Sequence, residues 1–161
     1  MYHDFWLFEE GVRSYVDHSD LLPRKDAPVR IDDGLLRYFV DTLSWIPTCN
    51  PMKIEVPCHG LNLYGPTIIN QTGGDAFHRV CLSWVQLFAS GPEHLSLRGP
   101  FMWQWPFDEE EHVLRENQLH LLGHYERLEV DRDWLLQALT TLADFGKQAA
   151  TGKFFILHLG I

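Results

Sequence analysis

Histidine is the first residue type in this sequence that could perform chemistry, since nine of the 161 residues are histidines. His120 and His124 lie four positions apart, and His112 precedes His120 by eight positions. On a helix, two histidines at that spacing can chelate one zinc ion, as they do in the zinc proteases. The glutamate that completes the zinc-protease motif is missing, however, and Gly123 interrupts the pair.

We expect a strand rather than a helix around these histidines. On a strand, His120 and His124 would lie about 13 Å apart at about 3.3 Å per residue, which is too far for one ion. We therefore predict no metal and no cofactor. The alternative is an enzyme or metal-binding protein that uses His112, His120 and His124.

The three cysteines, Cys49, Cys58 and Cys81, are the next candidates. Eight residues separate Cys49 from Cys58, which matches no compact metal-binding knuckle. A cysteine nucleophile needs a neighbouring histidine and a lowered pKa, and the adjacency of Cys58 and His59 in the sequence does not supply that geometry. An odd number of cysteines without a dense framework is typical of a reducing compartment, so we predict unpaired thiols.

The stretch "TGGD", residues 72–75, precedes a predicted helix, and glycines at such a place can hold a phosphate group. Neither the P-loop pattern nor the dinucleotide-binding pattern is complete, and Asp75 would repel a phosphate. We therefore interpret these residues as a turn followed by a helix cap. The glycine-flanked serine of the hydrolases is absent as well, and we predict that the protein is not an enzyme.

Large aromatic side chains directly precede a run of carboxylates in "FMWQWPFDEEEH", residues 101–112. Between positions 108 and 133 there are nine acidic and three basic residues, so this segment carries −6 of the formal charge of −9. Aromatic anchors supply affinity at interface centres, and surrounding acids steer a cationic partner. The predicted partner-binding residues are Trp103, Trp105, Phe107, Asp108, Glu109, Glu110 and Glu111.

A second interpretation of the same stretch is purely structural. On a strand, Trp103 and Trp105 share one face, and that face could pack into the core. The acidic residues would then only keep the following loop soluble.

The overall charge excludes several classes of partner. With 22 acidic and 13 basic residues, the chain is a poor candidate for binding nucleic acid or an anionic membrane, because both attract Lys and Arg. No apolar stretch is long enough for a transmembrane helix, and the N-terminus has no secretory signal. We predict a cytoplasmic protein with a basic protein partner, although acidity also serves solubility alone.

Four segments carry apolar residues at helical spacing, and each begins at an aspartate that could cap it. The predicted buried stripe of the last segment comprises Trp134, Leu135, Ala138, Leu139, Leu142 and Phe145. The predicted helices span residues 4–17, 32–46, 75–90 and 131–151.

Between the helices lie short stretches rich in residues that favour strands, separated by Gly and Pro. We predict strands at 53–56, 61–64, 67–70, twice within 94–105, in the second half of 119–130, and at 153–161. The order of elements shows no regular βαβ alternation. It predicts a single α+β domain over residues 1–161, with a mainly antiparallel sheet packed against three to four helices.

In its overall profile the chain resembles the small acidic immunity proteins that protect bacteria from toxins of their own kind. The points of resemblance are the size, the unpaired thiols, the stretch "WQWPFDEEEH", the closing "GKFFILHLGI" and the lack of a catalytic constellation. The resemblance implies a protein that blocks the active site of a toxin, often a nuclease with a basic cleft. Carboxylates would then lie where phosphates bind. A self-associating structural or adaptor domain is a further alternative.

Overall fold

The computed structural model describes residues 1–11, 27–103 and 123–160. Its central feature is a six-stranded sheet in the order β2-β1-β8-β5-β3-β4, in which every pair of neighbours is antiparallel. The strands of this sheet are β1 (Tyr2–Glu9), β2 (Val29–Asp32), β3 (Pro47–Asn50), β4 (Lys53–His59), β5 (Pro66–Ile69) and β8 (Phe154–Leu159).

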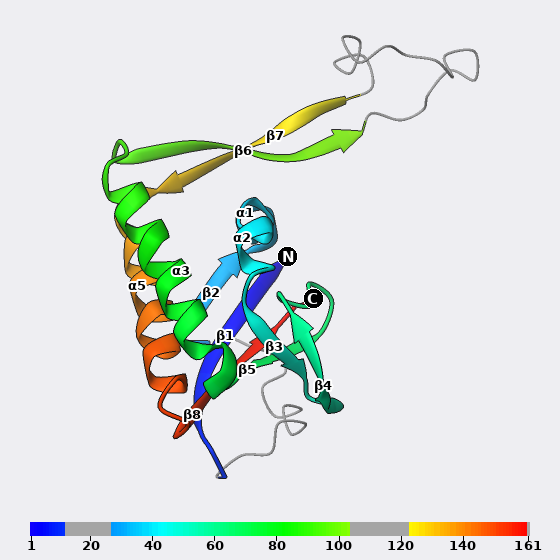
Figure 1. Cartoon of the computed structure of the whole chain (residues 1–161). Helices are drawn as coiled ribbons and strands as arrows, with labels where there is room; N and C mark the ends of the chain where they lie inside the picture. Colours follow the sequence, from blue (N-terminus) through cyan, green and yellow to red (C-terminus); the bar gives the residue numbers. More distant parts are fainter. Residues whose placement is uncertain (12–26, 104–122, 161) are drawn as a thin grey trace, which may run out of the picture.

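Two long helices, α3 (Gln71–Ala89) and α5 (Arg132–Ala149), lie side by side against the sheet (Figure 1). The short helices α1 (Asp33–Tyr38) and α2 (Val40–Leu43) follow β2. A separate antiparallel ribbon is formed by β6 (His94–Trp103) and β7 (Gly123–Asp131). This ribbon extends away from the sheet at one end of the two long helices (Figure 1). The predicted α+β class, with a mainly antiparallel sheet and four helices in the described ranges, is confirmed.

Both faces of the sheet are buried near its centre. On the face covered by the long helices, Phe5 and Ile156 belong to the larger hydrophobic cluster. On the opposite face, Ile68 and Leu157 belong to a second cluster. The strand β8 lies between β1 and β5 and contributes to both clusters, and it confirms the strand predicted at 153–161.

The predicted helix over residues 4–17 is wrong where the structure describes it, because Tyr2–Glu9 forms β1. The strand is paired on both sides, with β2 and with β8, and His3 to Trp6 are all buried. A strand buried on both faces carries apolar residues without a strict alternation, and here their spacing imitates a helical stripe. Asp4, the predicted helix cap, instead forms an ion pair with Arg30 of β2 at 3.2 Å.

The predicted helix over residues 32–46 is interrupted. Asp32 caps its start as expected, since its side chain accepts a hydrogen bond from the Gly34 N–H at 2.9 Å. At Phe39 the backbone tightens, and the Phe39 N–H donates to the Leu36 carbonyl at 3.0 Å. The Phe39 ring then packs on Trp84 of α3, with ring centroids 4.2 Å apart.

The helix predicted to begin at Asp75 begins earlier, at Gln71, and Asn70 is its cap. The two glycines of "TGGD" therefore lie within the first turn of α3 and not in a turn before it. A Cβ atom on Gly74 would lie 2.4 Å from the Ala150 nitrogen, and one on Gly146 would lie 2.7 Å from the His78 nitrogen. Gly74 and Gly146 thus let the backbones of α3 and α5 approach each other closely.

The strand predictions differ from the structure at two places. Residues 61–64 form no strand, because the Asn62 side chain accepts a hydrogen bond from the Tyr64 N–H at 3.1 Å and closes a turn. The two strands expected within 94–105 are one strand, β6, whose register shifts between Arg98 and Phe101. The strands expected around 53–56, 67–70 and 125–130 correspond to β4, β5 and β7.

The last helix, α5, is capped by Asp131, whose side chain accepts a hydrogen bond from the Trp134 N–H at 2.7 Å. Leu135, Leu139 and Leu142 are buried as predicted. Trp134 was expected in the same stripe, and that prediction is wrong, because its side chain is 43% exposed.

Candidate functional site

The β6–β7 ribbon carries the described part of the predicted partner-binding stretch. Phe101 pairs with Tyr125, and Trp103 pairs with Gly123. Because side chains alternate along a strand and directly paired residues share a face, Phe101, Trp103 and Tyr125 lie on one face of the ribbon. We call these three residues the aromatic face.

The aromatic face is a packed cluster that remains largely exposed. The Phe101 ring contacts Trp103 at 5.0 Å and Tyr125 at 5.1 Å between centroids, both edge to face. Trp103 is 58% exposed and Tyr125 is 45% exposed. Edge-to-face pairs stabilise a cluster beyond the burial of its area, so the three rings hold one another in place.

Charged groups border the aromatic face. The Arg98 guanidinium lies 3.4 Å from the centre of the Tyr125 ring. Arg127 donates to Ser96 at 2.6 Å and forms an ion pair with Glu129 at 2.6 Å. The side chains around the rings are therefore already positioned by contacts within the ribbon.

The structure describes only one of the predicted partner-binding residues. Trp103 lies at the end of β6, where it is exposed rather than packed in the sheet core. The others lie outside the described residues, namely Trp105, Phe107, Asp108, Glu109, Glu110 and Glu111.

The histidine alternative is described in part as well. His124 is exposed on β7, opposite Met102, whereas His112 and His120 lie outside the described residues. Within the described ranges, no three His, Cys, Asp or Glu side chains gather as metal ligands would.

The cysteines are free thiols, and two of them are buried. Cys49, Cys58 and His59 line one hollow of about 220 Å³ between β3, β4 and β5. Burial raises the pKa of the Cys49 thiol and of the Cys81 thiol, which disfavours the thiolate that a nucleophile needs. Cysteine chemistry at Cys49 or Cys81 therefore has no support.

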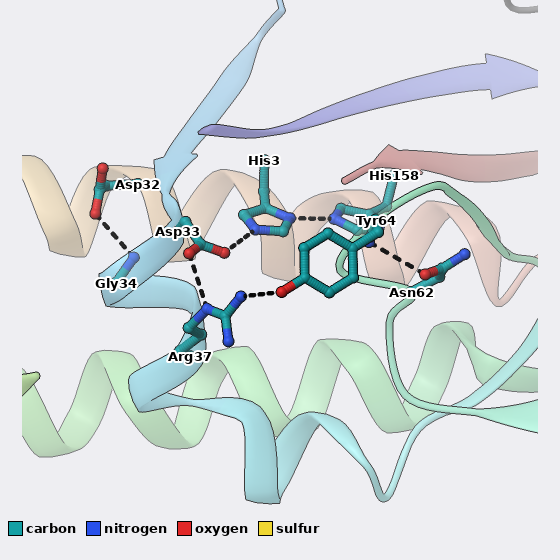
Figure 2. Close-up of polar contacts among 8 residues, drawn as sticks. All are labelled: His3, Asp32, Asp33, Gly34, Arg37, Asn62, Tyr64 and His158. Carbon is teal, nitrogen blue, oxygen red and sulfur yellow. Dashed lines mark hydrogen bonds and ion pairs between the residues drawn. The ribbon is translucent and has the colours of Figure 1, made fainter. Parts of the chain in front are cut away.

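A chain of polar contacts that the sequence did not predict runs from the buried pair of His3 and His158 to the exposed Tyr64 (Figure 2). His3 Nδ1 lies 2.9 Å from His158 Nε2, and both side chains are almost completely buried. His3 Nε2 lies 2.9 Å from a carboxylate oxygen of Asp33. The other oxygen of Asp33 accepts from Arg37 Nε at 2.8 Å, and Arg37 donates in turn to the Tyr64 hydroxyl at 2.8 Å.

Asp33 is the carboxylate of these polar contacts, and it lies between the His3 ring and the Arg37 guanidinium. Burial raises the pKa of the Asp33 carboxyl, but hydrogen bonds from His3 and Arg37 outweigh burial and leave its pKa below the ordinary value. The hydrogen bond to the Tyr64 hydroxyl, followed by the hydrogen bond to the Asp33 carboxylate, raises the pKa of the Arg37 guanidinium above its ordinary value. The chain joins β1, α1, β8 and the segment before β5, and so positions α1 against the sheet.

The sequence carried one weak signal for this chain. Asp33 and Arg37 are spaced four apart, as ion pairs on a helix are. His3 and His158 lie 155 positions apart, and only the pairing of β1 with β8 brings them together.

Comparison of the chain with protein-family models, with curated proteins and with solved structures found no match. None of the helices in the described ranges combines the length and hydropathy that crossing a lipid bilayer requires. Any function must therefore be argued from the site itself.

Proposed function

We propose that this protein is a protein-binding module whose contact surface is the aromatic face of the β6–β7 ribbon. The observation that carries the proposal is the exposure of Trp103 and Tyr125 on a ribbon that projects from the rest of the protein (Figure 1). Exposed aromatic clusters mark interaction sites, and Trp and Tyr are enriched among the residues that dominate binding energy.

The partner in this proposal is a basic protein. The formal charge of −9 supports it, since complementary charge speeds encounter and rejects wrong partners. Four carboxylates, Asp108 to Glu111, follow Trp103 closely in the sequence and would add to that attraction. With the resemblance to immunity proteins, the specific form of the proposal is a bacterial cytoplasmic inhibitor of a toxin or effector.

The surface is tested by a quantitative pull-down from a lysate of the source organism with three baits: wild type, Trp103→Ala and Trp45→Ala. Trp45 is the matched control, because it is 67% exposed and lies outside the ribbon. We expect one basic protein to be retained by wild type and by Trp45→Ala and lost with Trp103→Ala. Equal retention by all three baits would show that the ribbon is not the contact surface.

Inhibition is tested separately on the captured protein. Expressed alone in a bacterial host, it should arrest growth, and co-expression of the wild-type module should restore growth while Trp103→Ala does not. A captured protein that is harmless, or whose toxicity the module leaves unchanged, would contradict the immunity role and leave the binding role standing.

A further inference from the structure

Among the strands in the described ranges, β2 is an edge of the central sheet. It stands at the end of the strand order and pairs with β1. The Asp33 N–H donates to the Met1 carbonyl at 3.1 Å, so the adjacent pair, Tyr2 and Asp32, does not exchange hydrogen bonds. By alternation, Val29 and Ile31 direct their N–H and C=O groups to β1, while both groups of Arg30 and the N–H of Asp32 point away from β1. No other described strand borders that edge.

A groove lies beside this edge, between β2 and α5. One hollow of about 190 Å³ is lined by residues 28–30 on the strand side and by Trp134, Gln137 and Thr141 on the helix side. A second hollow of about 330 Å³ is bounded by Asp32, by residues 127–131 of β7 and again by Trp134. The exposed Trp134 side chain thus stands between two hollows that follow β2 from one end to the other.

An edge strand beside a helix is the arrangement in which proteins bind an extended peptide by adding it to the sheet. The outward N–H and C=O groups of Arg30 and the outward N–H of Asp32 can form main-chain hydrogen bonds with such a strand. The Asp32 carbonyl is at the N-cap of α1 and accepts the first hydrogen bond of that helix. Alternate side chains of the added strand would meet the two hollows. The larger hollow offers apolar walls from Leu35, Leu128 and Trp134.

The charge around the larger hollow indicates what kind of segment fits. Asp32, Glu129 and Asp131 line it together with one cation, Arg127, which is already paired with Glu129 at 2.6 Å. The lining therefore carries a net negative charge that favours Lys or Arg on the incoming segment. Residues 127–131 also form the base of the ribbon, so the groove is continuous with the ribbon that carries the aromatic face.

We infer that the open edge of β2, with the groove along α5, binds an extended basic segment of the partner protein by strand addition. This inference rests on the proposed protein-binding function and adds a second contact region to the aromatic face. The partner would contact the ribbon with one surface and extend the six-stranded sheet with another.

The test uses the full wild-type chain and a defined probe, an acetylated and amidated peptide of alternating Lys and Val. Binding is followed by NMR, with hydrogen exchange measured at individual backbone amides. We expect a Kd of about 0.1 to 1 mM, as suits a short segment of an interface, and slower exchange of the Arg30 and Asp32 amides. The same peptide with N-methylated backbone amides cannot donate to β2 and should not bind. A peptide of alternating Glu and Val should also fail to bind.

Trp134→Ala should weaken peptide binding by about tenfold, because it removes the side chain that separates the hollows. Leu87→Ala, at an exposed apolar residue of α3, is the matched control and should bind like wild type. No binding in the millimolar range, equal binding of the N-methylated peptide, or equal binding of the acidic peptide would each overturn the inference.

The two proposals can fail independently. If Trp103→Ala abolishes capture of the partner while the basic peptide does not bind, the aromatic face remains supported as the contact surface and strand addition is wrong. If the peptide protects the Arg30 and Asp32 amides while Trp103→Ala captures the partner normally, strand addition at β2 remains supported. The assignment of the ribbon as the contact surface is then wrong.

Discussion

His3 Nδ1 and His158 Nε2 lie 2.9 Å apart, near the beginning and the end of the described chain, with ring planes that differ by 9°. Only one hydrogen fits between two ring nitrogens at that distance, so one ring donates and the other accepts. Asp33 accepts from the opposite nitrogen of His3, and Thr67 Oγ1 lies 3.4 Å from the opposite nitrogen of His158. The direction of each hydrogen bond therefore depends on its neighbour.

The first prediction concerns the tautomers of this pair. With both rings neutral, His3 must carry its hydrogen on Nε2 to serve Asp33, which leaves Nδ1 as the acceptor for His158 Nε2–H. Nitrogen-15 NMR of the imidazole rings, recorded at alkaline pH, should show the Nε2–H form for both residues. An Nδ1–H form of neutral His158 would contradict this arrangement.

The second prediction concerns the stability that the pair supplies. His3→Phe removes the donor to Asp33 and the acceptor for His158, and leaves the buried His158 ring and the partly buried Asp33 carboxylate without this partner. We expect a loss of about 1 to 3 kcal/mol in the free energy of unfolding, measured by urea denaturation. His59→Phe, at an exposed histidine of β4, should stay within about 0.5 kcal/mol of wild type. Equal effects of the two substitutions would show that the buried pair is energetically neutral.

The third prediction concerns acid sensitivity at Asp33. Its pKa in the folded state lies below the ordinary value of 3.8, so ionised Asp33 stabilises the folded state. That contribution is complete above the pKa of the unfolded chain and is lost as the pH falls through the lower folded pKa. The difference in unfolding free energy between wild type and Asp33→Asn should therefore be constant near neutral pH and shrink below about pH 4. If the difference in unfolding free energy between wild type and Asp33→Asn grew as the pH fell, it would contradict the lowered pKa of Asp33.

The fourth prediction concerns the approach of the long helices. Gly74→Ala places a methyl group against the backbone at Ala150, and neither backbone can move aside without separating α3 from α5. We expect a loss of about 1 to 3 kcal/mol, although alanine favours a helix more than glycine does. Ser83→Ala, on the exposed side of α3, is the control for helix propensity. A Gly74→Ala variant as stable as wild type would mean that the close approach is dispensable.

The fifth prediction concerns thiol accessibility. Cys58 is partly exposed, whereas Cys81 is buried and burial raises its pKa. Brief treatment of the native protein with iodoacetamide, followed by mass spectrometry, should modify Cys58 and spare Cys81. Modification of both at equal rates in the native protein, with equal labelling after denaturation as the reference, would contradict this burial.

Much of the fold follows from local patterns in the sequence. The cap at Asp131, the apolar stripe that contains Leu135 and Leu139, and the alternation before it predict α5 and β7 close to their observed positions. The apolar closing segment predicts β8 and its burial. These predictions hold because caps, periodicity and long apolar runs act over a few residues, and the chain outside the segment need not be known.

Other features were decided by contacts between distant segments. Residues 2–9 became a strand because β8 and β2 border them on both sides, and nothing in their own spacing distinguishes that environment from a helix buried on one side. The His3–His158 pair exists for the same reason, since strand pairing closes a separation of 155 positions. The sequence by itself determined the α+β class and drew attention to Trp103. Tertiary structure decided that Trp103 is exposed and that Trp134 stands beside an open strand, because exposure depends on which distant segments cover a residue.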